Sequence, residues 1–197
     1  MAGGNANHPV LGCSTKVEPI RKKADISTIK RLLADRPRDL ALFTLGINTN
    51  LRASDLLRLR VGQVRGVEPN DHIEIKERKT GKARTVTLNG ACVKAIEGVL
   101  ASDDFDDEDY LFKSQRSPVL SVPSVHRLVK GWCRQINLKG NFGSHTLRKT
   151  WGYHQRVTFG VDLPRLMVCF NHSTQRQTLD YLCIQPEEIR DVFINEL

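Results

Sequence analysis

Apolar residues along this chain follow helical spacing in most segments and strand spacing in one. Apolar positions three or four apart mark one face of a helix, whereas alternation with period two marks a strand. Alternation over residues 71–76 and 84–88, on either side of a Thr-Gly pair, predicts a β-hairpin. The pattern therefore predicts an α+β fold, mainly α with a small antiparallel β-sheet. Helices are predicted over residues 25–35, 38–49, 53–59, 91–100, 121–136, from 144 onward, 163–170, and from 186 onward.

Short polar residues stand where several of these helices should begin. Asp25 or Ser27, Ser144 and Asp162 are predicted N-caps, because their side-chain oxygens can accept hydrogen bonds from unpaired N–H groups of the first turn. The segment 48–50 breaks a helix and leaves Arg52 at the start of the next one. The positive end of a helix dipole favours a phosphate at such a position.

Charge changes the picture more than composition does. The 197 residues carry a net charge of +8, and 40% of them are hydrophobic, as is ordinary for a globular protein. The segment 102–110 holds six acidic residues and no basic one, and 182–197 holds four acidic and one basic. Outside these segments the chain has 29 basic and 12 acidic residues. A basic body of this kind is typical of a protein that binds a polyanion such as nucleic acid, although a merely solvated basic surface would look the same.

The sequence indicates neither a membrane protein nor a disulfide framework. No apolar run approaches the ~20 residues of a membrane span, and residues 1–11 lack the order of a signal peptide, so a cytoplasmic location is expected. The five cysteines are widely spaced and are expected to be small buried side chains. No cofactor and no metal site are predicted. The cysteines stand at positions 13, 92, 133, 169 and 183.

The chemically richest stretch lies near the carboxyl end. His145 and Arg148 are three residues apart and so share one helix face, from which both can reach a single anion. His172 follows on a polar turn, and Tyr181 comes nine residues later. This set of two imidazoles, one guanidinium and one phenol lacks a carboxylate, which favours a phosphate site over a metal site.

These motifs, in this order, resemble the catalytic domain of the tyrosine recombinases, the phage integrase family. The family pattern is an arginine in a Gly-x-Arg-x-x-Glu setting, a lysine in a β-hairpin, His-x-x-Arg, a histidine after Leu-Gly, and a tyrosine nucleophile. The resemblance covers roughly residues 26–184. The chain departs from the pattern at Asn50, Asp55 and Asn171, which stand for glycine, glutamate and glycine. The matching residues are Arg52, Lys79, His145, Arg148, His172 and Tyr181.

The resemblance implies a mechanism. Arg52 and Arg148, with His172, would bind the oxygens of a DNA phosphate, and Tyr181 would attack its phosphorus to form a 3′-phosphotyrosyl intermediate. His145 would assist the loss of the Tyr181 proton, and Lys79 would assist protonation of the departing 5′ oxygen. Other basic residues of the hairpin and of the helix over 121–136 are expected to contact DNA. These are Lys76, Lys82, Arg84, Arg127, Lys130 and Arg134.

The resemblance also implies an organisation and partners. Residues 1–24 are expected to be a flexible arm, 25–184 the catalytic domain, and 185–197 a helical tail that docks on its own domain or on a neighbouring molecule. The partners implied are double-stranded DNA and further copies of the chain, as a tetramer on DNA and a monomer without it. Family members usually carry a separate DNA-binding domain, so this chain is expected to be a naturally short recombinase or an excised catalytic domain.

Two other functions fit the same scaffold. One is a DNA-binding regulator that has lost catalysis, which the departures at Asn50, Asp55 and Asn171 permit. The other is a DNA-relaxing enzyme that resembles the type IB topoisomerases, which use the same chemistry without pairing two sites. Covalent capture of DNA separates the recombinase from the regulator, and dependence on a paired site separates it from the relaxing enzyme.

Overall fold

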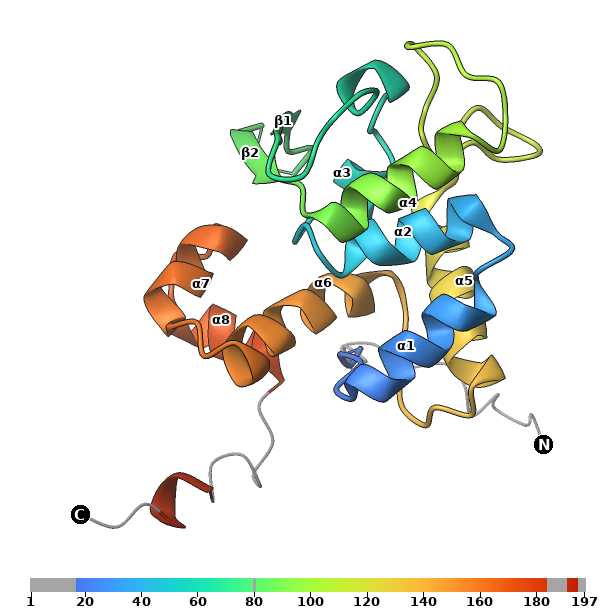
Figure 1. Ribbon diagram of the computed structural model, residues 1–197. Coiled ribbons are helices and arrows are strands. Elements are labelled where there is room, and N and C mark those ends of the chain that lie inside the picture. The colour runs from blue at the N-terminus through green and yellow to red at the C-terminus, as the bar shows by residue number, and fades with distance from the viewer. Residues whose placement is uncertain (1–16, 80, 184–190, 195–197) are drawn as a thin grey trace, which may run out of the picture.

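The computed structural model describes residues 17–79, 81–183 and 191–194 (Figure 1). Helices make up most of these residues, and one antiparallel hairpin is the only sheet among them, so the predicted fold class is confirmed. The strands are β1 (His72–Lys76) and β2 (Ala83–Thr87). The helices are α1 (Lys23–Leu32), α2 (Pro37–Gly46), α3 (Ala53–Leu56), α4 (Gly90–Leu100), α5 (Val122–Gln135), α6 (Ser144–Tyr153), α7 (Leu163–Phe170) and α8 (Gln175–Leu182). Shorter helical turns span Val61–Gln63, His154–Thr158 and Asp191–Ile194.

Most buried side chains belong to one main core, formed by α1 to α5, the hairpin and the first turns of α6. Helix α2 lies at its centre, and its residues 41–46 are all buried. The ring of Phe43 on α2 meets that of Trp132 on α5 edge to face, with centroids 5.9 Å apart. Leu147 brings α6 into the same core.

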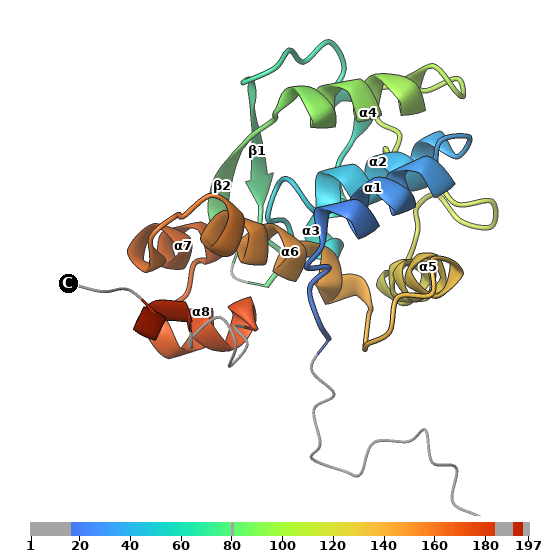
Figure 2. The same cartoon turned by 60° about the horizontal axis from the view of Figure 1, so that its bottom comes forward.

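A second, much smaller cluster lies where α6 leaves the main core. We call it the C-terminal cluster: Leu166, Phe170 and Leu182, with Trp151, Val161, Leu163 and Tyr181 packed at its edge. Figures 1 and 2 show α6 extending from the body of the molecule to α7 and α8, which lie together at its far end. Helix α6 therefore joins two regions of unequal size.

The hairpin forms over the two alternating segments, as predicted, and its register is fixed by the pairing of the strands. Ile73 pairs with Val86, and Ile75 pairs with Arg84. The turn closes through the Glu77 N–H, which donates to the Lys82 carbonyl, and the Gly81 N–H, which donates to the Glu77 carbonyl, both at 2.9 Å. Gly81 has a φ of 69°, a value that glycine adopts without strain.

Several predicted helix ends were wrong, for local reasons. Helix α1 begins after Lys22, so that Asp25 lies within its first turn, and α6 begins after Gly143, so that Ser144 is its first residue and not its cap. Asp162 caps α7 as predicted, its carboxylate accepting from the Arg165 N–H.

Helices α2 and α3 are shorter than predicted. Helix α2 ends at Gly46 instead of residue 49; its last turn loosens into residues 47–49, where the Asn48 amide donates to the Thr44 carbonyl, and Asn50 then adopts a left-handed φ of 55° that a helix cannot continue through. Helix α3 ends at Leu56, three residues before the predicted end.

The cysteines are not all buried as expected. Cys92 and Cys133 lie in the main core, but Cys169 is exposed and Cys183 is half-buried. Helix periodicity decides this outcome, because Cys169 lies on the face of α7 that turns away from the C-terminal cluster, next to the exposed Val168. Cys13 lies outside the described residues.

Most of the predicted final helix also lies outside the described residues. Asp191–Ile194 form a short 3-10 turn, in which Phe193 and Ile194 are exposed. No helix within 17–79, 81–183 and 191–194 has the length and apolarity needed to cross a bilayer.

Candidate active site

Helix α6 holds the central arginine of the site. Its first turn is fixed by the Gly143 N–H, which donates to the Thr146 hydroxyl at 3.0 Å, and Leu147 anchors it in the main core. Arg148 is only 3% exposed. Its Nη2 donates to the carbonyl of Phe170 at 3.0 Å, whereas its Nη1 is buried without a hydrogen-bond partner in the part of the chain described here. Buried donors are rarely left unpaired, so Nη1 marks the place for an acceptor from outside.

Aromatic rings arrange the second histidine and the tyrosine beside this arginine. The ring of His172 stacks on Phe170 with centroids 5.1 Å apart, and Tyr181 meets Phe170 at 5.0 Å. The Nδ1 of His172 and the hydroxyl of the buried Thr178 are 3.0 Å apart, which fixes the imidazole plane. The Arg148 guanidinium carbon is 5.9 Å from the Tyr181 ring centroid. Arg148, His172 and Tyr181 thus lie together, as expected from the sequence.

Lys149 also lies close to the tyrosine. Its Nζ is 5.2 Å from the Tyr181 ring centroid and 3.1 Å from the sulfur of Cys183. The residue is 6% exposed. A second cation is therefore held against the phenol, in addition to Arg148.

Arg52 approaches from the main core. It stands at the N-cap of α3, its side chain is 17% exposed, and its Nη1 is 2.8 Å from Oε2 of Glu77 and 3.7 Å from Oδ2 of Asp55. Asp55, the shorter substitute for the family glutamate, also accepts from the Arg78 N–H at 2.9 Å. Arg52 is therefore held by two buried carboxylates.

The two asparagines that replace family glycines keep the backbone that glycine would adopt. Asn50 has a φ of 55° and Asn171 a φ of 57°, both left-handed. Asparagine tolerates this region better than other residues with a side chain. Asn50 in addition donates from Nδ2 to the Cys169 carbonyl at 2.7 Å, which ties the loop before Arg52 to the end of α7. Neither departure distorts the site.

Burial and nearby cations shift the pKa values of the titratable groups. Desolvation lowers the pKa of His145, although this residue is exposed at the surface, and burial lowers the pKa of the half-buried His172; Arg148 and Arg52 lower both further. Burial raises the pKa of Tyr181, against the opposite effect of Arg148 and Arg52. Burial lowers the pKa of Arg148 to about 10, so that it remains charged at neutral pH. At neutral pH the imidazoles are neutral and the phenol is protonated.

The predicted lysine and the predicted DNA contacts lie mostly on the surface. Lys79 is exposed at the hairpin turn, next to Thr80, which lies outside the described residues, and its charge adds to those that lower the pKa of His145. Arg84 differs from the other predicted contacts, because its side chain is 18% exposed and donates to the Asn50 carbonyl at 3.3 Å. The exposed residues are Lys76, Lys82, Arg127, Lys130 and Arg134.

Glu77 is the site residue that sequence reasoning missed. The signal was present, because Glu77 continues the inward positions of Ile73 and Ile75 with period two, and both isoleucines are buried. A carboxylate at an inward position of a strand needs a charged partner. Lys149 was missed as well, and Phe170 was noted only as a departure from the family pattern.

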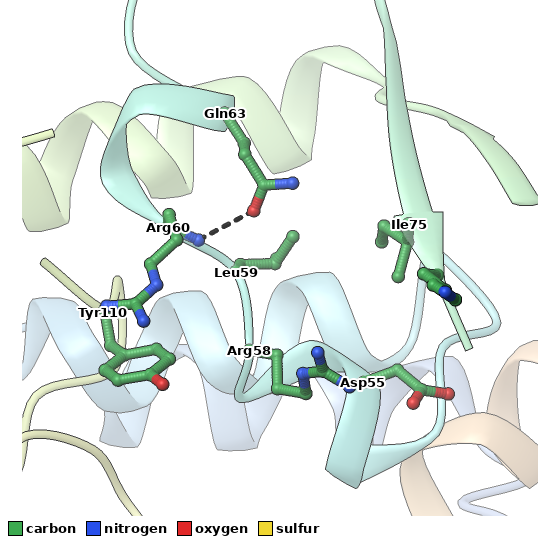
Figure 3. Close-up of a pocket in the computed structure, with 8 residues that line it drawn as sticks. Asp55, Arg58, Leu59, Arg60, Gln63, Ile75 and Tyr110 are labelled. Carbon is green, nitrogen blue, oxygen red and sulfur yellow. Dashed lines mark hydrogen bonds between the residues drawn. The ribbon is translucent and has the colours of Figure 1, made fainter. Parts of the chain in front are cut away.

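Two pockets border this site. One, of about 350 Å³, lies between the hairpin and α7 and is lined in part by Glu77, Arg84 and Asn171. Figure 3 shows the other, of about 280 Å³, where Arg58, Arg60 and Tyr110 line the space beside Asp55. In this second pocket the Arg60 guanidinium lies 3.6 Å from the Tyr110 ring centroid, and the Arg60 N–H donates to Gln63. One pocket thus contains Glu77 and the other contains Asp55, the two carboxylates that hold Arg52.

Solved recombinases share this architecture. XerA recombinase superposes with a TM-score of 0.73 at 20% identity, over 92% of this chain and 65% of that one. XerH site-specific recombinase, bound to a palindromic difH substrate, gives 0.72 at 16% identity, over 91% of this chain and 53% of that one. The fold is that of a tyrosine recombinase catalytic domain.

Sequence comparison gives the family. Residues 21–188 match the model of the phage integrase family. "Probable integrase/recombinase YoeC" of Bacillus subtilis is 34% identical over 182 residues, which are 90% of this chain and 95% of that relative. Tyrosine recombinase XerC of Caldanaerobacter subterraneus subsp. tengcongensis is 31% identical over 160 residues, 79% of this chain but only 44% of the relative. The chain belongs to the phage integrase family, and its function class is that of the tyrosine-type site-specific recombinases.

Proposed function

We propose that this chain cleaves and rejoins double-stranded DNA at specific sites through Tyr181. The Tyr181 oxygen attacks a backbone phosphorus, the bond from phosphorus to the 5′ oxygen breaks, and a 3′-phosphotyrosyl bond forms. A 5′ hydroxyl of a second strand then attacks the same phosphorus and releases the tyrosine. Each step exchanges one phosphodiester for another, so the bond energy is kept and no nucleotide cofactor is consumed.

The observation that carries the proposal is the empty donor of Arg148 beside Tyr181. Nη1 is buried and lacks a partner among the described residues, and the guanidinium carbon lies 5.9 Å from the phenol ring centroid. A guanidinium is suited to bind two oxygens of one phosphate, and charge on those oxygens grows in the pentacoordinate transition state. A phosphate that reaches Nη1 is therefore placed next to the attacking phenol.

The remaining residues act on charge and on protons. Arg52 and His172 complete the binding of the phosphate oxygens. His145, whose pKa is lowered, is neutral at physiological pH and so is able to accept the phenol proton. Lys79 on the hairpin donates a proton to the departing 5′ oxygen.

The same proposal covers the surroundings of the site. Residues 25–184 act as the catalytic domain, and Lys76, Lys82, Arg84, Arg127, Lys130 and Arg134 contact DNA beyond the scissile phosphate. The chain assembles as a tetramer on paired sites and is a monomer without DNA, with the tail 185–197 docking on a neighbouring copy. It acts in the cytoplasm. Backbone-phosphate binding of this kind weakens steeply as salt rises.

Covalent trapping tests the proposal. The chain is incubated with a pool of nicked duplexes with a randomised core, in which the short downstream fragment released by cleavage, which carries the free 5′ hydroxyl, diffuses away and so prevents religation. After denaturation, protein that remains attached to DNA is isolated, and the attached DNA is sequenced. We expect an adduct enriched in one core sequence, which is lost in Tyr181→Phe and kept in Tyr153→Phe.

Each failure has its own meaning. An adduct that survives Tyr181→Phe places the nucleophile elsewhere. Binding to the pool with no adduct at all contradicts the cleavage chemistry. An adduct without sequence enrichment contradicts site specificity.

A further inference from the structure

Glu77 is a carboxylate buried at the base of the hairpin that carries Lys79. It follows β1 on the inward side, is 2% exposed, and has its backbone fixed by both hydrogen bonds of the turn. Removing a carboxylate from water is costly unless cations pair with it. The residues around Glu77 therefore indicate its role.

Two arginines from different segments meet this carboxylate. Oε2 is 2.8 Å from Nη1 of Arg52, at the start of α3, and Oε1 is 3.5 Å from Nη1 of Arg84, on β2. The same Nη1 of Arg84 donates to the carbonyl of Asn50, two residues before Arg52. Glu77 and Arg84 thus hold Arg52 through both its side chain and the loop that leads to it.

We propose that Glu77 is a positioning residue, which holds the Arg52 guanidinium at the phosphate site and couples it to the hairpin that carries Lys79. The inference rests on the proposed function, since it assigns how one of the phosphate-binding groups is placed. Glu77 acts through Arg52 and does not itself touch the DNA.

Charge explains why an anion is needed there before DNA arrives. Arg52, Arg84 and Arg148 bring three guanidinium groups to one site, where their like charges repel one another. Arg52 and Arg84 both act to lower the pKa of Arg148, whereas Glu77 acts to raise it, so the carboxylate offsets part of the repulsion. Without it, Arg52 would be free to turn towards solvent.

Connectivity explains the coupling to the hairpin. Lys79 lies two residues after Glu77, on the turn that the backbone of Glu77 closes. A shift of the hairpin therefore moves the carboxylate that holds Arg52, and a shift of Arg52 moves the base of the turn. The hairpin thus positions together Arg52, proposed to bind the phosphate, and Lys79, proposed to protonate the departing 5′ oxygen.

The test compares Glu77→Gln with Glu74→Gln, a matched variant that removes the same charge from an exposed position of β1. Cleavage of the nicked duplex isolated from the random pool is timed, and binding to the same duplex is measured. We expect Glu77→Gln to slow cleavage on the order of 10²-fold, the effect of a reacting group misplaced by about 1 Å. Binding should be unchanged or tighter, because a negative charge near the phosphates is lost. Glu74→Gln should cleave at the wild-type rate.

Two further measurements separate positioning from general damage. In the Arg52→Lys background, Glu77→Gln should slow cleavage by no more than about threefold, because residues that act through one another are not additive. The Nε–Hε signal of Arg52 in ¹⁵N NMR, assigned by its loss in Arg52→Lys, should show a rigid side chain in the wild type and in Glu74→Gln but a mobile one in Glu77→Gln.

Wild-type cleavage by Glu77→Gln, equal losses in the two backgrounds, or a rigid Arg52 signal in Glu77→Gln would each overturn the inference. Absence of any adduct from the wild-type chain would instead refute the proposed function. The NMR comparison, which needs no activity, would in that case still decide whether Glu77 holds Arg52.

Discussion

The main core and the C-terminal cluster share helix α6 but differ in how firmly they are built. The main core joins five helices and the hairpin, and it carries Arg52 and its carboxylates. The C-terminal cluster has three fully buried apolar side chains, Leu166, Phe170 and Leu182, and it carries His172 and Tyr181. Local unfolding is easier where fewer apolar contacts are buried. The proposed nucleophile Tyr181 is thus in the region with fewer buried apolar side chains, and Arg52 and Arg148, proposed to bind the phosphate, are in or anchored to the larger core.

Two hydrogen bonds link the end of α7 to the rest of the site. Arg148 donates to the Phe170 carbonyl, and Asn50 donates to the Cys169 carbonyl, each crossing to the last residues of α7. The predictions below act on these links or on the packing on either side of them.

The largest effect is expected at Arg148. Arg148→Ala should lower the cleavage rate on the order of 10²–10³-fold, as does loss of one transition-state donor in other enzymes. It should also loosen α7, because the bond to Phe170 is lost. Single-turnover cleavage and amide hydrogen exchange measured together check this. Faster exchange throughout the main core would show that Arg148 supports the whole fold and not the link alone.

A matched pair of glycine substitutions tests the packing on each side of α6. A Cβ on Gly46 would lie 2.5 Å from Leu147 Cδ1, and one on Gly152 would lie 2.4 Å from the Phe170 ring. Each added methyl group should cost about 1–3 kcal/mol. Gly46→Ala should lower the temperature of global unfolding. Gly152→Ala should displace Phe170, slow cleavage and raise hydrogen exchange in α7 and α8, with little change in global unfolding.

The two substitutions distinguish the main core from the C-terminal cluster only if their effects on global unfolding differ. Equal losses of global stability from Gly46→Ala and Gly152→Ala would show one cooperative unit, and the distinction drawn above would be wrong.

Acid should act on both regions, and of His154 and His172 only His154 should register in global unfolding. Burial lowers the pKa values of His154 and His172, so between the usual histidine pKa and the lowered one the unfolded chain binds more protons than the folded chain. Stability therefore falls as pH falls below about 6.5. His154 joins the segment before α1 to the end of α6, its Nε2 lying 2.9 Å from the Ile20 carbonyl. Unfolding temperatures at pH 7.5, 6.5 and 5.5 should fall less steeply in His154→Gln than in the wild type, and His172→Gln should keep the wild-type slope.

The smallest effects are expected at the two left-handed asparagines. Asn171→Gly keeps the backbone and should change stability by less than about 0.5 kcal/mol. Asn50→Gly keeps the backbone but removes the bond to Cys169, and it should cost about 1 kcal/mol. Chemical denaturation resolves this difference. A larger loss from Asn171→Gly would mean that its side chain has a role that the geometry does not show.

Sequence periodicity predicted most of the helices and the hairpin because these depend on local spacing, but it missed α8 (Gln175–Leu182), the helix that carries Tyr181, whose residues 175–178 are all polar. Ile73 and Ile75 both face inward because side chains alternate along a strand. Asp162 caps α7 through a hydrogen bond from the residue three positions later in the chain. The helix ends at Gly46 and Leu56 were missed, because short hydrogen bonds and turns outweigh weak propensities there.

The candidate site was predicted in its members but not in its contacts. His145 and Arg148 share a helix face by spacing alone. The pairing of Glu77 with Arg52, and of Arg148 with the Phe170 carbonyl, joins residues 25 and 22 positions apart and depends on how the hairpin and α7 dock. Such contacts follow from tertiary packing, which no local pattern encodes.

The segment that leads into α1 is hydrogen-bonded to α6, the helix that carries Arg148, and to the residue that follows it. The Ile20 N–H donates to the Thr150 hydroxyl at 2.8 Å, and the Ile20 carbonyl lies against His154, both residues at the end of α6 or just beyond it. In mechanical terms, tension applied upstream of Ile20 would be transmitted to α6 before it reached any other helix. A domain or a surface attached at that end would pull directly on the element that positions Arg148.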